Sequence, residues 1–107
     1  MSHSLIRLAG LVAFLMTAHA VAASETGRAL VQKNCGSCHA VGVDDRSPLP
    51  VAPPFRDVAK RYPPDSLAES LAEGIVTGHE GMPEFVFQPA EIVSIVQYLE
   101  ELRGSGG

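Results

Sequence analysis

Tryptophan is absent from the sequence, cysteine occurs twice, and basic side chains are outnumbered by acidic ones. Two cysteines exclude a scaffold held by several disulfide bonds, and they also exclude a structural zinc site of the four-thiolate kind. Eight Lys and Arg against twelve Asp and Glu give a formal net charge of −4, so the basic face typical of a nucleic-acid-binding protein is missing. With 107 residues, of which 46% are hydrophobic, the chain can form one domain at most.

The alternation of apolar and polar residues that is typical of strands is also missing, and no internal repeat occurs. Helical spacing is clearest near the end of the chain, where Pro89 suits a first helical position and Gly104 closes the segment. Ser66 and Glu69 have the spacing of a capping box at the start of another helix. We therefore expect an all-α fold with Pro/Gly-rich loops. Helices are predicted over residues 24–34 with Ser24 as N-cap, around 55–62, from 66 to the region of Ile75 and Gly78, and from 89 onwards; loops are predicted over 42–54 and 77–88.

The first 23 residues differ from the rest of the chain. Arg7 is followed by an apolar run over 8–16 and then by small residues that end in Ala20-Val21-Ala22-Ala23. This layout is typical of a secretory signal peptide, cleaved near Ala22 or Ala23, and the apolar run is shorter than the ~20 residues of a membrane span. An uncleaved anchor over residues 5–23 is the alternative. We predict an exported, periplasmic protein with a signal peptide at 1–23 and a domain at 24–107.

Without residues 1–23, few residues remain that could bind a metal or a cofactor. The remaining 84 residues carry seven basic and twelve acidic residues, two histidines (His39 and His79) and one methionine, Met82. A domain of this size is often marginal without a disulfide, a metal or a cofactor. We therefore expect a bound group to supplement the apolar core.

Residues 35–39, Cys-Gly-Ser-Cys-His, form the C-x-x-C-H sequence of c-type haem attachment. The thiols of Cys35 and Cys38 can each bond one vinyl group on one edge of the porphyrin, which places His39 beneath the iron as an axial ligand. A thioredoxin-type redox pair would need a βαβ setting, a zinc site would need a further ligand such as distant His79, and a short-loop disulfide is a third alternative. A small, exported, all-α chain favours one covalently attached haem.

The second axial ligand is expected from the opposite side of the iron. Met82 and His79 are the soft and imidazole candidates. Met82 stands between Gly81 and Pro83, in a loop that can present its thioether and that is a poor position for core filling. We favour Met82 over His79.

With these motifs the chain resembles the small class I cytochromes c, over residues 25–102. The resemblance is carried by Cys35-x-x-Cys38-His39, by Met82-Pro83, and by a terminal helix that contains Tyr98-Leu99. It implies a fold in which the N- and C-terminal helices cross, with Gly27 at the crossing and Tyr98 packed over it. Val31 stands where that family usually has an aromatic residue.

The resemblance also implies that the carbonyl of Pro53 accepts a hydrogen bond from Nδ1 of the proximal His39 and fixes its tautomer. Ala52 replaces a common glycine before this proline. The haem pocket is expected to be lined by Leu67, Leu71, Phe85, Phe87, Ile95 and Leu99. Arg56 and Arg61 are candidates to pair with haem propionates, or else are solvated surface charges.

A haem iron with both axial positions filled leaves no open site for a substrate, which indicates outer-sphere electron transfer rather than catalysis. We expect a monomeric carrier that is not an enzyme and that exchanges single electrons with a dehydrogenase or reductase donor and a terminal acceptor. Two alternatives are a cytochrome subunit of a larger periplasmic oxidoreductase, and a haem catalyst in which Met82 detaches and His79 or Glu80 acts as acid and base. Contact with a membrane is expected only through the signal peptide or a partner complex.

Overall fold

The computed structural model describes residues 2–74 and 81–105, with side chains described for residue 16 and from residue 18 onwards. Four helices and no strand occur in these ranges: α1 (Ser2–Cys35), α2 (Phe55–Arg61), α3 (Pro64–Glu73) and α4 (Pro89–Ser105). The all-α prediction is therefore confirmed. Ile75, Gly78, His79 and Glu80, which the sequence analysis singled out, lie outside the described residues.

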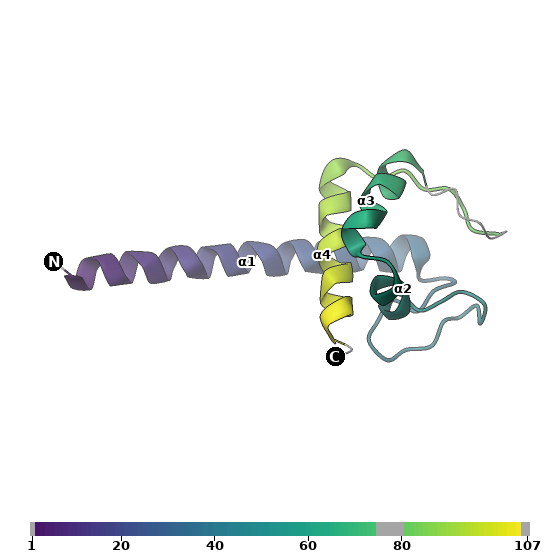
Figure 1. The fold of residues 1–107 in the computed structure, drawn as a ribbon, viewed down its shortest axis with the longest axis horizontal. Coiled ribbons are helices and arrows are strands. Elements are labelled where there is room, and N and C mark those ends of the chain that lie inside the picture. Colours follow the sequence, from purple (N-terminus) through teal and green to yellow (C-terminus); the bar gives the residue numbers. More distant parts are fainter. Residues whose placement is uncertain (1, 75–80, 106–107) are drawn as a thin grey trace.

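The last helix occupies the centre of the fold. α4 packs against α1, α2 and α3, and it crosses the C-terminal half of α1 at a steep angle (Figure 1). The N-terminal half of α1 extends away from this body, and the longest dimension of the molecule is therefore 64 Å. The core lies between α4 and the other helices; its buried members are Val31, Val41, Ala59, Leu71, Phe87, Ile92, Ile95, Tyr98, Leu99 and Leu102.

The crossing of α1 and α4 takes place at a glycine, as the resemblance to cytochromes c implies. A Cβ atom placed on Gly27 would overlap the backbone carbonyl of Ser94 in α4. The two helix backbones can approach this closely only because residue 27 has no side chain. Val31, one turn further along α1, is buried at the same interface and is 3% exposed.

Two predicted helix starts are wrong, while two others agree with the structure. α1 continues through Ser24, which is buried inside the helix, because the alanine-rich residues before it also favour helix. α3 begins at Pro64, two residues before Ser66, and its N-cap residue Pro63 makes no side-chain capping bond. A proline at the first helical position is already fixed in a helical φ, so it sets the start. α4 begins at Pro89 as predicted, and α2 closely matches its predicted range.

None of the helices in the described part of the chain combines the length and the apolar character that a membrane span requires.

Candidate functional site

The Cys-x-x-Cys-His segment follows directly from the end of α1. Cys35 is the last residue of the helix, and its carbonyl accepts bonds from the backbone N–H groups of Cys38 (3.2 Å) and His39 (3.0 Å). The segment therefore folds into one tight turn. Both cysteines are half-buried and neither is in a disulfide, so the alternative of a short-loop disulfide is not realised in this structure.

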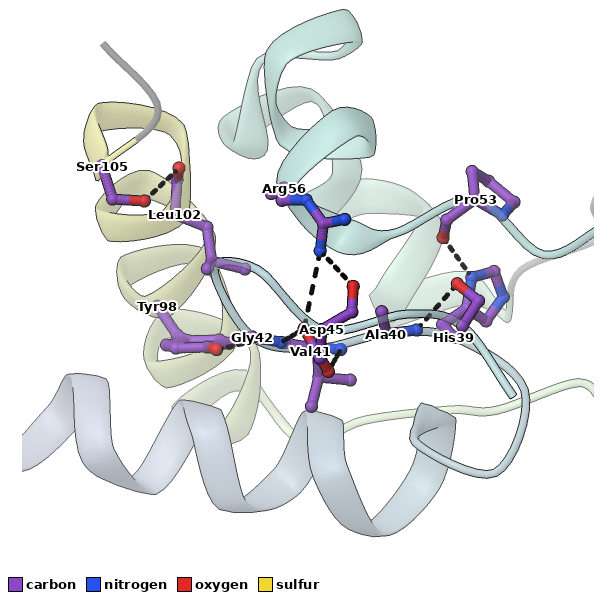
Figure 2. Close-up of polar contacts among 11 residues, drawn as sticks. His39, Ala40, Val41, Gly42, Asp45, Pro53, Arg56, Tyr98, Leu102 and Ser105 are labelled. Atoms are coloured by element: carbon purple, nitrogen blue, oxygen red, sulfur yellow. Dashed lines mark hydrogen bonds and ion pairs between the residues drawn. The ribbon is translucent and has the colours of Figure 1, made fainter. Parts of the chain in front are cut away.

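His39 is buried and held on two sides. Its Nδ1 lies 2.7 Å from the carbonyl oxygen of Pro53 (Figure 2). Its ring stacks on Phe55 with centroids 4.8 Å apart and planes at 14°. A carbonyl can only accept, so Nδ1 carries a proton, and in the neutral tautomer this leaves on Nε2 the lone pair that a metal needs. This is the contact that the resemblance implied for Pro53. It fixes both the tautomer and the orientation of the imidazole.

The segment after His39 is fixed by side chains from its own loop. The N–H of Ala40 donates to the hydroxyl of Ser47 (3.0 Å). The carboxylate of Asp45 accepts bonds from the N–H groups of Val41 (3.2 Å) and Gly42 (2.9 Å), as Figure 2 shows. These bonds satisfy three successive backbone donors next to the histidine.

Two helices hold the same segment from outside. The N–H of Phe55, the first residue of α2, donates to the carbonyl of Ala40 (2.9 Å), and Arg56 donates to the backbone carbonyl of Asp45 (2.7 Å). From α4, the hydroxyl of Tyr98 donates to the carbonyl of Val41 (Figure 2). The turn that carries His39 is thus tied to the two helices on either side of it. This network was not predicted from the sequence; an Asp and a Ser shortly after a turn were the available signal.

Two adjoining cavities open on His39. The larger has a volume of about 420 Å³ and the smaller of about 310 Å³, and both are lined by Cys35, His39, Met82 and Phe85. The structure thus brings the predicted thioether of Met82 to the same space as the predicted imidazole. All six apolar residues predicted to line the pocket do line the larger cavity, namely Leu67, Leu71, Phe85, Phe87, Ile95 and Leu99.

The loop that carries Met82 has the backbone that its sequence suggested. Gly81 has φ = +86°, in the left-handed region that glycine adopts without strain, and it brings the half-buried Met82 to both cavities. Cys38 and Pro83 line the smaller cavity only. His79, the competing ligand candidate, lies outside the described residues.

The donor set and the walls fit a covalently attached haem. Two free thiols, one imidazole with Nε2 free and one thioether surround a space whose walls are mainly apolar. Burial raises the pKa of the Cys35 thiol to about 11, so an unattached Cys35 is protonated at neutral pH. Among the described residues, no group of three or more His, Cys, Asp and Glu side chains is arranged to hold a metal ion, so the zinc alternative gains no support.

Comparison with known proteins assigns the family. Residues 22–99, most of the chain, match the family described as cytochrome c oxidase, cbb3-type, subunit III. No curated protein and no solved structure matches the chain. The resemblance to the small c-type cytochromes is confirmed, and with it a domain type that serves haem-based electron transfer. The chain belongs to the family of cytochrome c oxidase, cbb3-type, subunit III, as a small c-type cytochrome domain.

Proposed function

We propose that this protein is an exported monohaem c-type cytochrome that carries single electrons by outer-sphere transfer, with His39 and Met82 as axial ligands of the iron. The observation that carries the proposal is the pair of cavities lined by both ligand candidates and by Cys35, beside an imidazole whose Nδ1 is bonded to Pro53. A haem in this site would supply a one-electron Fe(III)/Fe(II) couple. Because both axial positions would be filled, the iron would have no free position at which to bind a substrate.

The residues around the site have separate roles in this proposal. Pro53 holds the proton on Nδ1 of His39, which keeps Nε2 directed at the iron and raises the basicity of the ligand. Met82 supplies a soft thioether, a ligand that favours Fe(II) and raises the reduction potential. The apolar walls exclude water. A drier site disfavours the extra charge of Fe(III), so these walls also raise the reduction potential.

Cys35 and Cys38 would form the covalent bonds. Each thiol would add its sulfur and its hydrogen across one vinyl group, so no external oxidant is needed. The raised pKa of Cys35 leaves little thiolate in the folded chain at neutral pH, and the thiolate is the more reactive form. This supports attachment to a chain that has not yet closed around the site.

Export and partners complete the proposal. Removal of residues 1–23 would leave a periplasmic protein that starts near Ser24. It would carry seven basic residues, two of them lysines, and twelve acidic residues. We therefore propose redox partners with basic or neutral surfaces. The description of the matching family favours a second candidate function, an electron-transfer subunit of a larger periplasmic oxidoreductase. Both candidates use the same site. They differ in whether the protein elutes from a periplasmic extract as a monomer or with other chains.

The absorption spectrum of the protein matured in a periplasm tests the ligand assignment, with Met82→Ala beside the wild type. We expect low-spin haem with the thioether-to-Fe(III) charge-transfer band in the wild type, and loss of that band in the variant. High-spin wild-type haem that binds external ligands would overturn the ligand assignment. Intact mass should give a chain that begins near Ser24 plus one haem, and a haem-free monomer with two free thiols would overturn the whole proposal.

A further inference from the structure

A third cavity, of about 300 Å³, lies where α1 and α4 meet the loop after His39. It shares no lining residue with the two cavities beside His39. Most of its lining residues are polar or charged, and the full set is Ser24, Glu25, Arg28, Gly42, Val43, Tyr98, Glu101, Leu102 and Ser105. The haem site does not use this cavity, so its polar wall calls for a separate explanation.

The charges in this wall do not balance. Glu25 and Glu101 contribute two carboxylates, whereas Arg28 contributes one guanidinium. Burial raises the pKa of Tyr98, while Arg28 lowers it and Asp45 and Glu101 raise it further, so charges from both helices act on one small region. The excess of negative charge favours a cationic ligand.

The same face of α4 also carries a buried oxygen that lacks a donor. Gln97 lies one helical turn before Glu101, so the two side chains are neighbours on the helix surface. Oε1 of Gln97 is buried and has no hydrogen-bond partner among residues 2–74 and 81–105. A ligand with several N–H donors would therefore suit this face better than one with a single donor.

Ser24 is the residue through which the chain itself can supply such a group. It lines the third cavity and is 4% exposed, whereas the described side chains of residues 16 and 18–22 are exposed. Hydrolysis of the peptide bond between Ala23 and Ser24 would add one water, leaving a carboxyl group on Ala23 and an amino group on Ser24. That amino group is an ammonium with three N–H donors below its pKa of about 7.7–8.0. A positive charge at the N-terminal end of a helix is unfavourable unless an anion lies nearby.

We propose that the α-ammonium group of Ser24, formed when residues 1–23 are removed, binds the carboxylate of Glu101 at the third cavity. The inference rests on the proposed function, because it needs the chain to be cleaved before Ser24. The ion pair would join the new end of α1 to α4 close to their crossing at Gly27. Glu101 is then a binding residue for the processed N-terminus, and it takes no part in the haem site.

The test uses haem-loaded protein matured in a periplasm, first as the wild type and then as Glu101→Gln. Limited acetylation with acetic anhydride over a pH series, followed by mass spectrometry of the N-terminal peptide, gives the pKa of the α-amino group. We expect a wild-type pKa above the ordinary range of about 7.7–8.0, since a carboxylate favours the charged form of an amine. In Glu101→Gln the pKa should fall by about 0.2–0.7, the size expected for an exposed ion pair.

Glu100→Gln is the matched control. Glu100 is the exposed neighbour of Glu101 on α4 and lines none of the three cavities, so the same change of charge should leave the pKa in place. Equal pKa values in the wild type and Glu101→Gln, or equal falls in Glu101→Gln and Glu100→Gln, would overturn the assignment of Glu101. A haem-loaded chain that begins at Ala23 would also overturn it. Failure of the proposed function looks different, because the chain would then lack haem or keep residues 1–23 by mass.

Discussion

The environment of His39 shows how few residues are needed to fix the tautomer and the orientation of an imidazole. One carbonyl, that of Pro53, determines the tautomer, and one ring, that of Phe55, limits the rotation of the side chain. Both come from a single short stretch before and within α2. Bonds to the backbone after His39 then hold the turn itself, so the folded protein fixes the position of this imidazole.

The hydroxyl of Tyr98 is one of these holding groups, and Tyr98→Phe removes it. We expect the free energy of unfolding to fall by about 1 kcal/mol, since the carbonyl of Val41 loses a buried donor. Tyr62→Phe is the control, because Tyr62 is 51% exposed, and we expect a change below about 0.5 kcal/mol. Chemical denaturation of the haem-loaded proteins measures both, and equal effects would contradict the role of the buried bond.

The same hydroxyl has a consequence at alkaline pH. Burial raises the pKa of Tyr98, with Arg28 lowering it and Asp45 and Glu101 raising it further. The folded state therefore keeps a proton that the unfolded state releases. Its contribution to stability is complete below the ordinary tyrosine pKa of about 10 and is lost as pH rises through the higher folded pKa. In Tyr98→Phe this part of the alkaline loss of stability should disappear. A pH series of denaturation curves measures the free energy of unfolding, and an equal alkaline loss in the variant and the wild type would contradict the role of Tyr98.

Asp45 gives a third prediction about a single residue. Asp45→Ala removes the acceptor of two backbone N–H groups and the carboxylate next to Arg56. We expect a loss of about 1–3 kcal/mol in the free energy of unfolding. The neighbouring exposed Asp44→Ala should change it by less than about 0.5 kcal/mol. A loss in Asp44→Ala as large as that in Asp45→Ala would argue for a general charge effect instead.

Among the elements, α4 connects the site to the rest of the fold. It packs on all three other helices, and its residues Ile95 and Leu99 line the larger cavity while Ser94 meets Gly27 of α1 on another side. A change in the crossing of α1 and α4 is therefore expected to reach the cavity. The close approach of the two helices where they cross in Figure 1 depends on the missing side chain at residue 27.

Gly27→Ala tests the crossing. The added Cβ would overlap backbone atoms of Ser94, which cannot rotate away as a side chain could, so the helices must move apart. We expect a loss of about 1–3 kcal/mol or more. Gly104→Ala is the matched control, because a Cβ there meets nothing within 4 Å near the end of α4, and it should stabilise by up to about 1 kcal/mol. Thermal unfolding of the two variants should therefore shift in opposite directions, and a neutral Gly27→Ala would contradict the close crossing.

The elements also show where sequence reasoning succeeds. The start of α4 at Pro89 was predictable because proline suits the first helical position, whereas the roles of Gly27 and Pro53 were implied by the resemblance to the class I cytochromes c. Ser24 and Ser66 were misread as caps, since a capping side chain is a weak local preference. The alanines before Ser24 and the prolines before Ser66 outweighed it.

Side-chain contacts such as that between Tyr98 and Val41 could not be predicted from the sequence. Tyr98 and Val41 are 57 residues apart, and nothing local to either residue indicates their bond. The same holds for the difference between Arg56 and Arg61, which are five positions apart on one short helix. The loop over residues 42–54 brings Asp45 to Arg56, whereas Arg61 lines the larger cavity.

For the molecule as a whole, the N-terminal half of α1 extends away from the other helices (Figure 1). The described side chains of residues 16 and 18–22 are exposed, whereas Ser24 is 4% exposed. A chain that starts at Ser24 should therefore unfold within about 0.5 kcal/mol of the full chain. A chain that starts at Leu30 loses the contact of Gly27 with Ser94 and should be clearly less stable. A large loss of unfolding free energy in the chain that starts at Ser24 would show that the residues before Ser24 stabilise the body.

The body itself should depend on the haem for its stability. Two adjoining cavities of about 420 and 310 Å³ lie against the core of a small domain, and apolar surface contributes ~25 cal/mol per Å² only when it is buried. The double variant Cys35→Ser/Cys38→Ser, which cannot attach haem, should show weaker helical circular dichroism and no cooperative urea transition. Met82→Ala is the control, because it keeps both attachment cysteines and most of the buried contact, and it should retain a cooperative transition. Full helicity with a cooperative transition in the haem-free double variant would show that the helices close the core by themselves.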